Sequence, residues 1–361
     1  MLKLGIKNML DRAPLLPNNW QEWIAKHKSR KIADGEIVNA MIQQGIDIRI
    51  ATAAVKEIIP TENNNGDRAA EAKIAQLEAK IAQQAEQLKT LKLQLDIYYD
   101  LEQIEPNFGK IERRSGLSRQ EFLENYYAKN RPVILTDIVP QWPAHSRWTP
   151  DYLKEKYGHL DVSVQYDRDS NPLYEIEKEK HQKTMKLGEY ADLVVNGGKT
   201  NQYYMVPFNA NILKDEFQGL FEDVQLSDDY FDRSLGRERF SFWFGPEGTI
   251  TPLHFDLMNS FLCQVYGRKR MRLISPNQKH LMYNYMSFHT PIDLDRPDFT
   301  KYPLFKNVNV IDVVIHPGEA MFVPAGWWHH VTALDITISL SVMNFIFPNG
   351  YDHLLSKNYE I

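Results

Sequence analysis

The sequence predicts an α+β chain with a mainly β core in its large C-terminal part and a helical N-terminal part. From Phe240 onward, short runs of β-branched and aromatic residues are separated by Gly and Pro, which is typical of a β-sandwich or barrel. Residues 69–98 instead repeat apolar side chains at alternating spacings of three and four, the pattern of a coiled-coil helix. We therefore expect three parts: a helical module and linker at 1–66, a coiled-coil helix at 67–100 and a mainly β domain at 101–361.

Composition and charge narrow the class of protein. The 361 residues carry a formal net charge of −5, which gives no general attraction to nucleic acid or to an anionic membrane. No apolar run is long enough to span a bilayer, and charges interrupt the N-terminus before a signal-peptide core develops. The single cysteine, Cys263, excludes an internal disulfide and is interpreted as a small core residue. We expect a cytoplasmic protein.

Residues 1–60 have the pattern of a small helical module. Apolar residues recur at helical spacing around Trp20 and Ile24, and again around Ile37 and Met41. Gly45 and Pro60 are helix-stop signals, and residues 61–66 are polar and rich in turn formers. The module shows no catalytic constellation, so we interpret it as a structural or docking appendage.

The heptad segment that follows predicts a long helix with one apolar seam. Its a positions are Ile74, Ile81, Leu88 and Leu95, and its d positions are Leu77, Gln84, Leu91 and Tyr98. Isoleucine or leucine at a with leucine at d favours two parallel strands, so we expect a homodimer through this segment. The alternative is a single helix that folds back on its own domain, because antiparallel packing uses the same seam.

Several elements are expected between this helix and the β-rich region. Ser118 with Glu121 three residues later has the spacing of a capping box, which predicts a helix through Tyr127. Residues 131–136 are typical of a buried strand, and Pro150 marks the first turn of another helix. Further strands are expected through 162–166 and 202–206.

Three side chains from two distant segments predict a metal site. In an extended strand His254 and Asp256 point to the same face, which brings an imidazole and a carboxylate together. A third ligand comes from the Pro324-Ala-Gly-Trp-Trp-His329 turn; whether His329 or the adjacent His330 faces inward stays open from spacing alone. Two histidines and one carboxylate with open positions form the facial triad of non-haem Fe(II) oxygenases. The alternative for His254 and Asp256 is a salt-bridged pair; His280, His289 and His316 are interpreted as core histidines.

A second set of residues predicts an anion site beside the metal. Alternation along residues 268–273 places Lys269 on the apolar face, where an unpaired ammonium is costly and requires an anion. Asn344 stands on the apolar face of the last strand, in phase with Ile338 and Leu340, and also requires polar partners. Thr251 adds a hydroxyl near His254. Together these residues favour an anionic organic ligand.

These motifs resemble a known family. Gly248, His254 and Asp256 are similar to the first cupin motif, and Gly318 to His329 looks like the second. With Gly267-Arg-Lys-Arg and Arg131-Pro-Val-Ile-Leu-Thr, residues 108–350 resemble the Jumonji-C (JmjC) hydroxylases of the cupin-8 type. The resemblance implies a double-stranded β-helix, or jelly roll, that uses Fe(II) and the cosubstrate 2-oxoglutarate.

The resemblance also implies a role for each matched residue. His254, Asp256 and His329 would hold Fe(II), since the family ligand directly follows the tryptophan. The residues implied for 2-oxoglutarate are Lys269 on its distal carboxylate, Thr251 and Tyr204 beside that carboxylate, and Asn344 close by. Ser260 departs from the family, which usually carries Asn there; here Asn259 precedes it.

The reaction implied is hydroxylation of an unactivated C–H bond by a 2-oxoglutarate-dependent dioxygenase, and the expected substrate is a protein or peptide side chain. Three alternatives remain open: a small metabolite or modified tRNA base as substrate, demethylation by the same iron chemistry, and a non-catalytic cupin-fold binding protein. The negative net charge disfavours nucleic acid. A non-catalytic protein would release no succinate.

Overall fold

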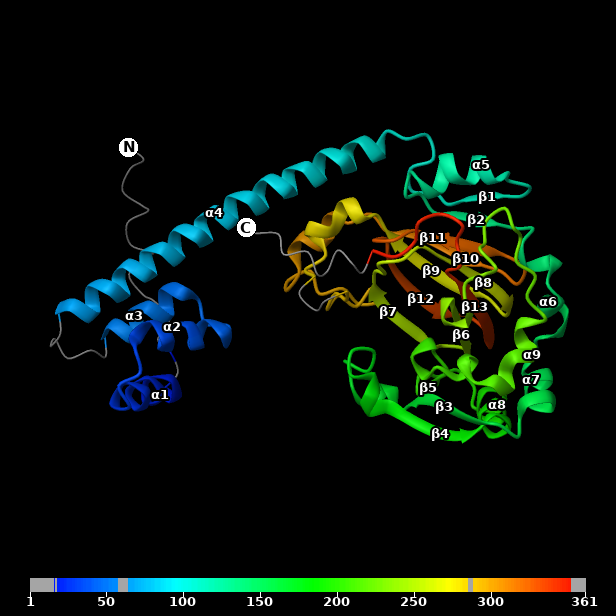
Figure 1. Ribbon diagram of the computed structural model, residues 1–361, viewed down its shortest axis with the longest axis horizontal. Helices are drawn as coiled ribbons and strands as arrows, with labels where there is room; N and C mark the ends of the chain where they lie inside the picture. Colours follow the sequence, from blue (N-terminus) through cyan, green and yellow to red (C-terminus); the bar gives the residue numbers. More distant parts are fainter. Residues whose placement is uncertain (1–15, 17, 58–63, 285–287, 352–361) are drawn as a thin grey trace. The chain divides into compact units, whose positions relative to one another are not determined.

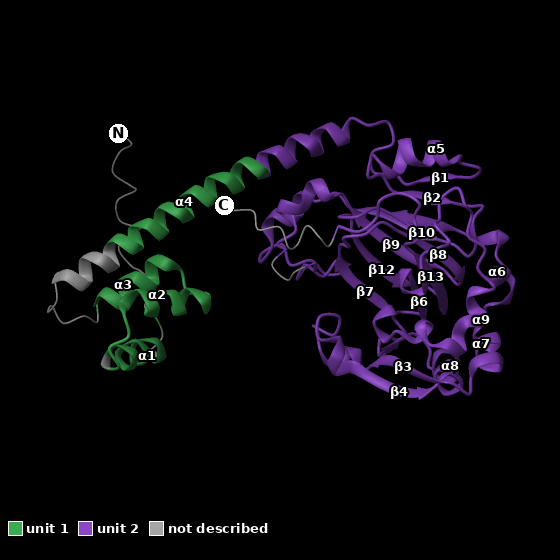
Figure 2. Ribbon diagram, viewed as in Figure 1, with its two compact units in different colours: residues 1–91, 361 green, residues 92–360 purple. Residues whose placement is uncertain are grey.

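The computed structural model describes residues 16, 18–57, 64–284 and 288–351 (Figure 1). The chain divides into two compact units, Met1–Leu91 and Lys92–Glu360, and the boundary falls inside one long helix (Figure 2). The charged N-terminal residues and the first half of the expected linker lie outside the described residues.

The first unit contains the predicted helical module. It consists of α1 (Asn18–Ser29), α2 (Asp34–Gln43) and α3 (Ile48–Glu57). Their apolar faces form one small core around Ile24, Val38, Met41 and Val55. Gly45 lies just after the end of α2 and has φ +84°, a conformation that glycine adopts without steric cost. The three helices therefore follow the pattern that the sequence predicts.

The long helix α4 (Asn64–Gln103) contains the heptad segment. It begins inside the segment that the sequence favours as a linker. Ile81, Leu88 and Leu91 of the seam are exposed along the helix, whereas Leu95 is half-buried. A single continuous helix is thus present, and its pairing with a second copy stays a prediction. Within the described residues, no helix combines the length and apolar character needed to cross a bilayer.

The second unit begins with mixed elements. Ser118 caps α5 (Arg119–Phe122), and a π-helical turn at Leu123–Tyr127 continues it, as the capping box predicts. The α-helices and strands that precede the central strands are β1 (Glu112–Arg114), β2 (Val133–Leu135), α6 (Pro143–Arg147), α7 (Pro150–Tyr157), β3 (Asp161–Tyr166), β4 (Gln182–Lys186), α8 (Leu187–Asn196), β5 (Tyr203–Tyr204) and α9 (Gln218–Phe221). Strands β4, β3 and β5 form a small sheet in that order.

Eight further strands form the centre of this unit (Figure 1). They are β6 (Phe240–Gly245), β7 (Ile250–His254), β8 (Ser260–Tyr266), β9 (Lys269–Ile274), β10 (Ile311–Ile315), β11 (Ala320–Val323), β12 (Trp328–Ala333) and β13 (Thr337–Val342). One sheet has the order β1-β2-β11-β8-β13-β6 and the other has the order β10-β9-β12-β7.

The two larger sheets pack face to face. Leu262 and Met321 of the six-stranded sheet share a core with Met271, Leu273 and Val331 of the four-stranded sheet. Apart from β9 and β10, successive strands from β6 to β13 alternate between the two sheets. This arrangement fits a jelly roll and confirms the mainly β core.

Candidate active site

The two predicted motif histidines are neighbours across two strands. His254, the last residue of β7, pairs directly with His329 near the start of β12. The centroids of their imidazole rings lie 4.2 Å apart. The first and second motifs lie far apart along the chain, but His254 and His329 meet at one end of the four-stranded sheet.

The ligand atoms of His254, Asp256 and His329 lie within 4.8 Å of one another. The Nδ1 atoms of the histidines lie 2.7 Å from the Pro252 carbonyl oxygen and 3.0 Å from that of Trp327. Donation from each Nδ1 to its carbonyl leaves both Nε2 atoms free, 3.9 and 3.7 Å from the Asp256 carboxylate oxygens. Burial, and next the neighbouring His254, lower the pKa of His329 to about 4, so its imidazole is neutral at pH 7.

This donor set fits Fe(II). Two imidazoles and one carboxylate match the facial triad, and the two carbonyls favour the tautomer that metal binding needs. It is the one such cluster of His, Cys, Asp and Glu in the part of the chain that the structure describes. Gly326, with φ +83°, donates its N–H to the Asp256 carbonyl at 2.8 Å and so ties the two motifs together.

A β-bulge brings Thr251 to the same side as His254. Simple alternation would place residues three apart on opposite faces. However, Thr251 pairs with Val331 and His254 pairs with His329, so three steps on β7 match two steps on β12. Both side chains consequently line one cavity, which we call the metal pocket.

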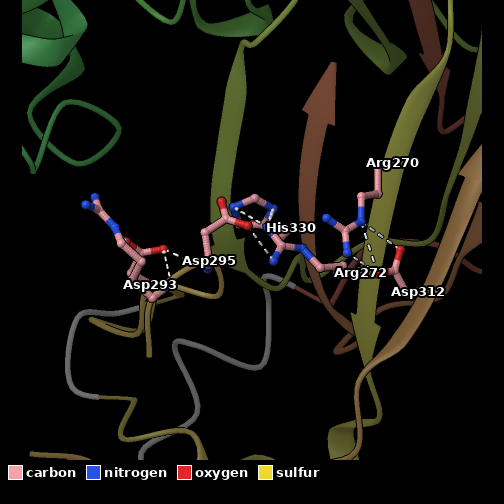
Figure 3. A network of polar contacts seen from close by, with 7 residues as sticks. Arg270, Arg272, Asp293, Asp295, Asp312 and His330 are labelled. Carbon is pink, nitrogen blue, oxygen red and sulfur yellow. Dashed lines mark hydrogen bonds and ion pairs between the residues drawn. The ribbon is translucent and has the colours of Figure 1, made fainter. Parts of the chain in front are cut away.

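His330 does not line the metal pocket. It belongs to a polar network with Arg272 and Asp295, which Figure 3 shows. Its Nδ1 lies 3.1 Å from the guanidinium of Arg272, which forms a 2.8 Å ion pair with Asp295. On the same outer face of the sheet, Arg270 pairs with Asp312. Of the two adjacent histidines, His329 therefore lines the metal pocket and His330 does not.

Lys269 is a buried cation without a carboxylate partner. Its side chain lines the metal pocket and is 2% exposed, and its Nζ donates to the Tyr204 hydroxyl at 3.1 Å. The Nζ also lies 5.6 Å from the ring centroid of Trp243. Among the described residues no acidic side chain forms an ion pair with it, and burial lowers its pKa to about 7. The requirement for an anion is therefore present in the structure.

The position of Lys269 suits a dicarboxylate that reaches the metal ligands. Lys269 pairs with Ala333, four residues along β12 from His329, which corresponds to roughly 13 Å between the two backbone positions. The lysine side chain and a five-carbon diacid together span this separation. The metal pocket has a volume of about 60 Å³, and Thr251, Tyr204 and Lys269 all line it. These residues fit 2-oxoglutarate.

Asn344 is not part of this pocket. The sequence places it beside the cosubstrate, but it lies in another cavity, where its Nδ2 donates to the Leu235 carbonyl at 3.1 Å. The cause is the phase of β13. Its odd residue Ser341 lines the metal pocket, whereas Leu340 and Val342, in phase with Asn344, pack into the core on the opposite face.

Ser260 and Asn259 have separate positions. Ser260, the first residue of β8, lines the metal pocket. Asn259 is buried, and its Oδ1 accepts the N–H of Ala325 at 2.9 Å while its own N–H donates to Asn349. Asn259 therefore holds the loop before the second motif and does not substitute for an asparagine at the position of Ser260.

Sequence patterns missed several residues of the site. Trp243 and Ser341 line the metal pocket, and the Trp243 Nε1–H donates to the Ser341 Oγ at 3.0 Å. The fully buried Arg168 lies against the Tyr204 ring at 5.3 Å and donates to the Ile250 carbonyl at 2.7 Å. No local pattern around Arg168 distinguishes it from a surface arginine.

The three histidines that the sequence favours as core residues behave differently from one another. The His280 side chain is mostly buried, and its Nε2 lies 2.7 Å from the Asp96 Oδ1. It therefore behaves as a buried histidine with a polar partner. His316 is exposed, which corrects its interpretation as a core residue. The His289 ring stacks on the His254 ring with centroids 5.5 Å apart, so it packs against one of the predicted metal ligands. The buried thiol of Cys263, whose pKa burial raises, is a core residue as expected.

The family is decided by comparison with known proteins. The cupin-like domain family, Cupin_8, matches residues 118–353. The chain belongs to this family. The match confirms the resemblance to JmjC-type cupins, whose enzymes use Fe(II) and 2-oxoglutarate.

Individual relatives carry different names. Lysine-specific demethylase JMJ30 of Arabidopsis thaliana is 29% identical over 64% of this chain and 54% of that protein. Lysine-specific demethylase 8 of Danio rerio is 30% identical over 62% of this chain and 55% of that protein. tRNA wybutosine-synthesizing protein 5 of Gallus gallus is 28% identical over 72% of this chain and 82% of that protein. The chain spans about half the length of the demethylases that it matches.

Proposed function

We propose that this chain is a 2-oxoglutarate-dependent oxygenase that hydroxylates an unactivated C–H bond on a protein or peptide side chain. The observation that carries the proposal is the buried, carboxylate-free Lys269 in the same pocket as His254, Asp256 and His329. A cupin-fold protein with a purely structural metal has no need of an unpaired internal ammonium. Successive strands alternate between the two larger sheets, and this supports a double-stranded β-helix as the specific form of the jelly roll.

Each residue of the pocket has a defined task. His254, Asp256 and His329 would hold Fe(II), which together with 2-oxoglutarate and O₂ supplies hydroxylation coupled to release of succinate and CO₂. The ammonium of Lys269 and the Tyr204 hydroxyl bind the distal carboxylate, and Thr251 offers a further hydroxyl. Trp243 packs beside the ammonium and excludes water from that end of the pocket.

The openness of the metal end supports a macromolecular substrate. The Asp256 side chain is 54% exposed, whereas Lys269 is fully enclosed, so the ligands lie at the mouth and the cosubstrate end lies inside. The pocket volume of about 60 Å³ is far below the range of about 300–1,000 Å³ of sites that enclose a drug-sized molecule. A side chain presented from outside satisfies both observations better than a whole metabolite enclosed with the cosubstrate.

A modified tRNA base is the second candidate. The match to tRNA wybutosine-synthesizing protein 5, which covers 82% of that protein, favours it. Against it stands the net charge of −5. In the cavity beside Pro252 and His289, the three carboxylates of Glu175, Asp293 and Asp295 also outnumber the two cations of Arg296 and Lys301. Demethylation, the activity in the names of the other relatives, would follow from hydroxylation of an N-methyl group by the same residues.

The proposal is tested by comparing peptides from cells that contain either the wild-type protein or its His254→Ala variant. We expect at least one peptide that gains one oxygen with the wild-type protein only. Purified protein should then convert 2-oxoglutarate to succinate in step with oxidation of that peptide. Oxidation of RNA or of small molecules, without any oxidised peptide, would contradict the protein substrate, and absence of succinate with every substrate would contradict the enzyme itself.

A further inference from the structure

A second cavity of about 680 Å³ lies outside the metal pocket, at the start of β6. We call it the β6 cavity. Its apolar wall is formed by Phe221, Val224, Leu226, Leu235 and Phe240. Cavities of this size accommodate drug-sized ligands, so it has room for a bulky side chain with part of its peptide backbone.

Strand register places the β6 cavity at the metal-binding end of the barrel. Ser260, which lines the metal pocket, pairs with Val323 at one end of β8. The next residue, Phe261, pairs with Val342 of β13, and Val342 pairs in turn with Phe240 of β6. Phe240 lies in the wall of the β6 cavity. The backbones of Ser260 and Phe240 are therefore about two strand spacings apart, or roughly 10 Å along the same edge of the sheet, while the Phe240 side chain lies on the face opposite to the metal pocket.

One buried polar atom in the β6 cavity lacks a partner. Asn344 is 1% exposed, and its Nδ2 donates to the Leu235 carbonyl. Its Oδ1 accepts no hydrogen bond from any described residue, which is costly for a buried amide oxygen. Because this atom is itself buried, a ligand N–H or O–H group satisfies it once the Asn344 side chain turns toward the cavity.

The charged side chains that line the β6 cavity, among the described residues, are two arginines. Arg233 and Arg237 line it, and no acidic side chain does so among the described residues. Arg233 pairs with Asp228 and Arg237 with Asp215, but both aspartates are largely exposed. Exposed ion pairs contribute only about 0–1 kcal/mol, so a ligand carboxylate can replace either aspartate at little cost.

We propose that the β6 cavity docks a substrate polypeptide through a bulky apolar side chain next to an acidic residue. The apolar side chain packs against Phe221 and Phe240, a backbone N–H donates to the Asn344 Oδ1, and the carboxylate pairs with Arg237. This inference rests on the proposed protein substrate and adds a sequence preference to it.

The separation of the two sites sets the spacing along the substrate. An extended chain advances about 3.3–3.6 Å per residue, so roughly 10 Å along the sheet edge takes about three residues, and about 10 Å more to the facing sheet that carries His254 and His329 takes about three further residues. The docked apolar residue should therefore lie at least about six residues from the residue that reacts.

The test selects binders from a displayed library of random linear peptides on the immobilised full-length protein. Enriched peptides should share a bulky apolar residue beside Asp or Glu. A synthetic consensus peptide should bind at least tenfold more weakly to Arg237→Glu, which reverses the charge at the rim, and to Val224→Trp, which fills the cavity.

Arg270→Glu is the matched control, because Arg270 also pairs with a partly exposed aspartate, Asp312, but lies on the outer face of β9. It should bind the consensus peptide as the wild-type protein does, and melting temperatures show that all variants fold. A library without this consensus, or a consensus peptide that binds all four proteins alike, would overturn the docking role.

Oxidation of the same peptides separates the two proposals. Peptides that gain an oxygen but bind independently of Arg237 and Val224 would overturn the docking cavity and leave the proposed function in place. Peptides that bind through these residues, while no library peptide is oxidised, would support the cavity and count against the proposed function.

Discussion

His330 lies 3.1 Å from the guanidinium of Arg272, on the face of β12 opposite to its neighbour His329. Two adjacent imidazoles thus have different surroundings: one meets the Asp256 carboxylate and the other a buried cation. Because Arg272 is itself held by Asp295, the network fixes the rotation of β12 that points His329 toward the metal pocket.

The adjacent histidines form a matched pair of variants. His329→Ala should lower the affinity for Fe(II), or for Co(II) as a probe, by about 100-fold or more, because one of three ligands is lost. His330→Gln should retain metal affinity within a few-fold and lose about 1 kcal/mol of stability with the Arg272 contact. Metal titration and thermal unfolding measure the two effects; equal loss of metal in both variants would show that the ligand is misassigned.

Substitution of Lys269 should have opposite effects on stability and on cosubstrate binding. Lys269→Met removes a buried ammonium that lacks a carboxylate, so the ligand-free protein should unfold at the same or a higher temperature. Affinity for 2-oxoglutarate should fall about 100-fold, since the ligand carboxylate loses its cation in a buried site. Thermal unfolding with and without 2-oxoglutarate measures both, and a variant still stabilised by the ligand as strongly as wild type would refute the assignment.

The pKa of Lys269 predicts how 2-oxoglutarate affinity depends on pH. Burial lowers this pKa to about 7 in the ligand-free protein, and a bound carboxylate raises it again. Binding therefore takes up a proton above pH 7. The dissociation constant should be nearly constant below pH 7 and rise up to about tenfold per pH unit above it. Calorimetry in buffers of different ionisation enthalpy would detect the proton uptake; proton release, or an affinity that increases with pH, is the opposite result.

We propose that α4 pairs two copies of the chain through its exposed seam. Leu88 is 57% exposed and Leu91 is 54% exposed, and both lie at seam positions of the heptad repeat. Replacement of both by glutamate should convert a dimer into a monomer in sedimentation experiments on the full chain. Glutamate at Thr90, which lies between them on another face, is the control that should leave the dimer intact. A wild-type chain that sediments as a monomer at micromolar concentration would refute the pairing.

The site residues that sequence predicted best are those whose side-chain direction follows from a local rule. Alternation along β9 placed Lys269 inside. The choice of His329 over His330 came instead from the family resemblance, in which the ligand directly follows the tryptophan. The prediction for Asn344 was wrong because alternation defines two faces of β13 but does not say which face lines the pocket. Burial does not distinguish them either, since both faces of this strand are buried. The bulge that aligns Thr251 with His254 depends on strand pairing and has no local signal.

Long-range packing was equally inaccessible from the sequence. The helices of residues 18–57 and the capping box at Ser118 follow from local spacing and were predicted. Arg168 and His289 reach the site only through the folded path of the chain, from segments whose composition is that of ordinary loops. Their roles depend on which ring each one contacts, and that information lies in the tertiary structure.

The most direct test of the central claim is an anaerobic titration of the full chain with Fe(II) and 2-oxoglutarate, followed by the visible absorption of the chelated cosubstrate. The wild-type protein and His330→Gln should each bind one Fe(II) and one 2-oxoglutarate per chain and develop the absorption band. His329→Ala should bind neither in this way, and Lys269→Met should need far more 2-oxoglutarate. A wild-type protein that binds Fe(II) but shows no band at saturating 2-oxoglutarate would contradict the assignment of this pocket to an oxygenase.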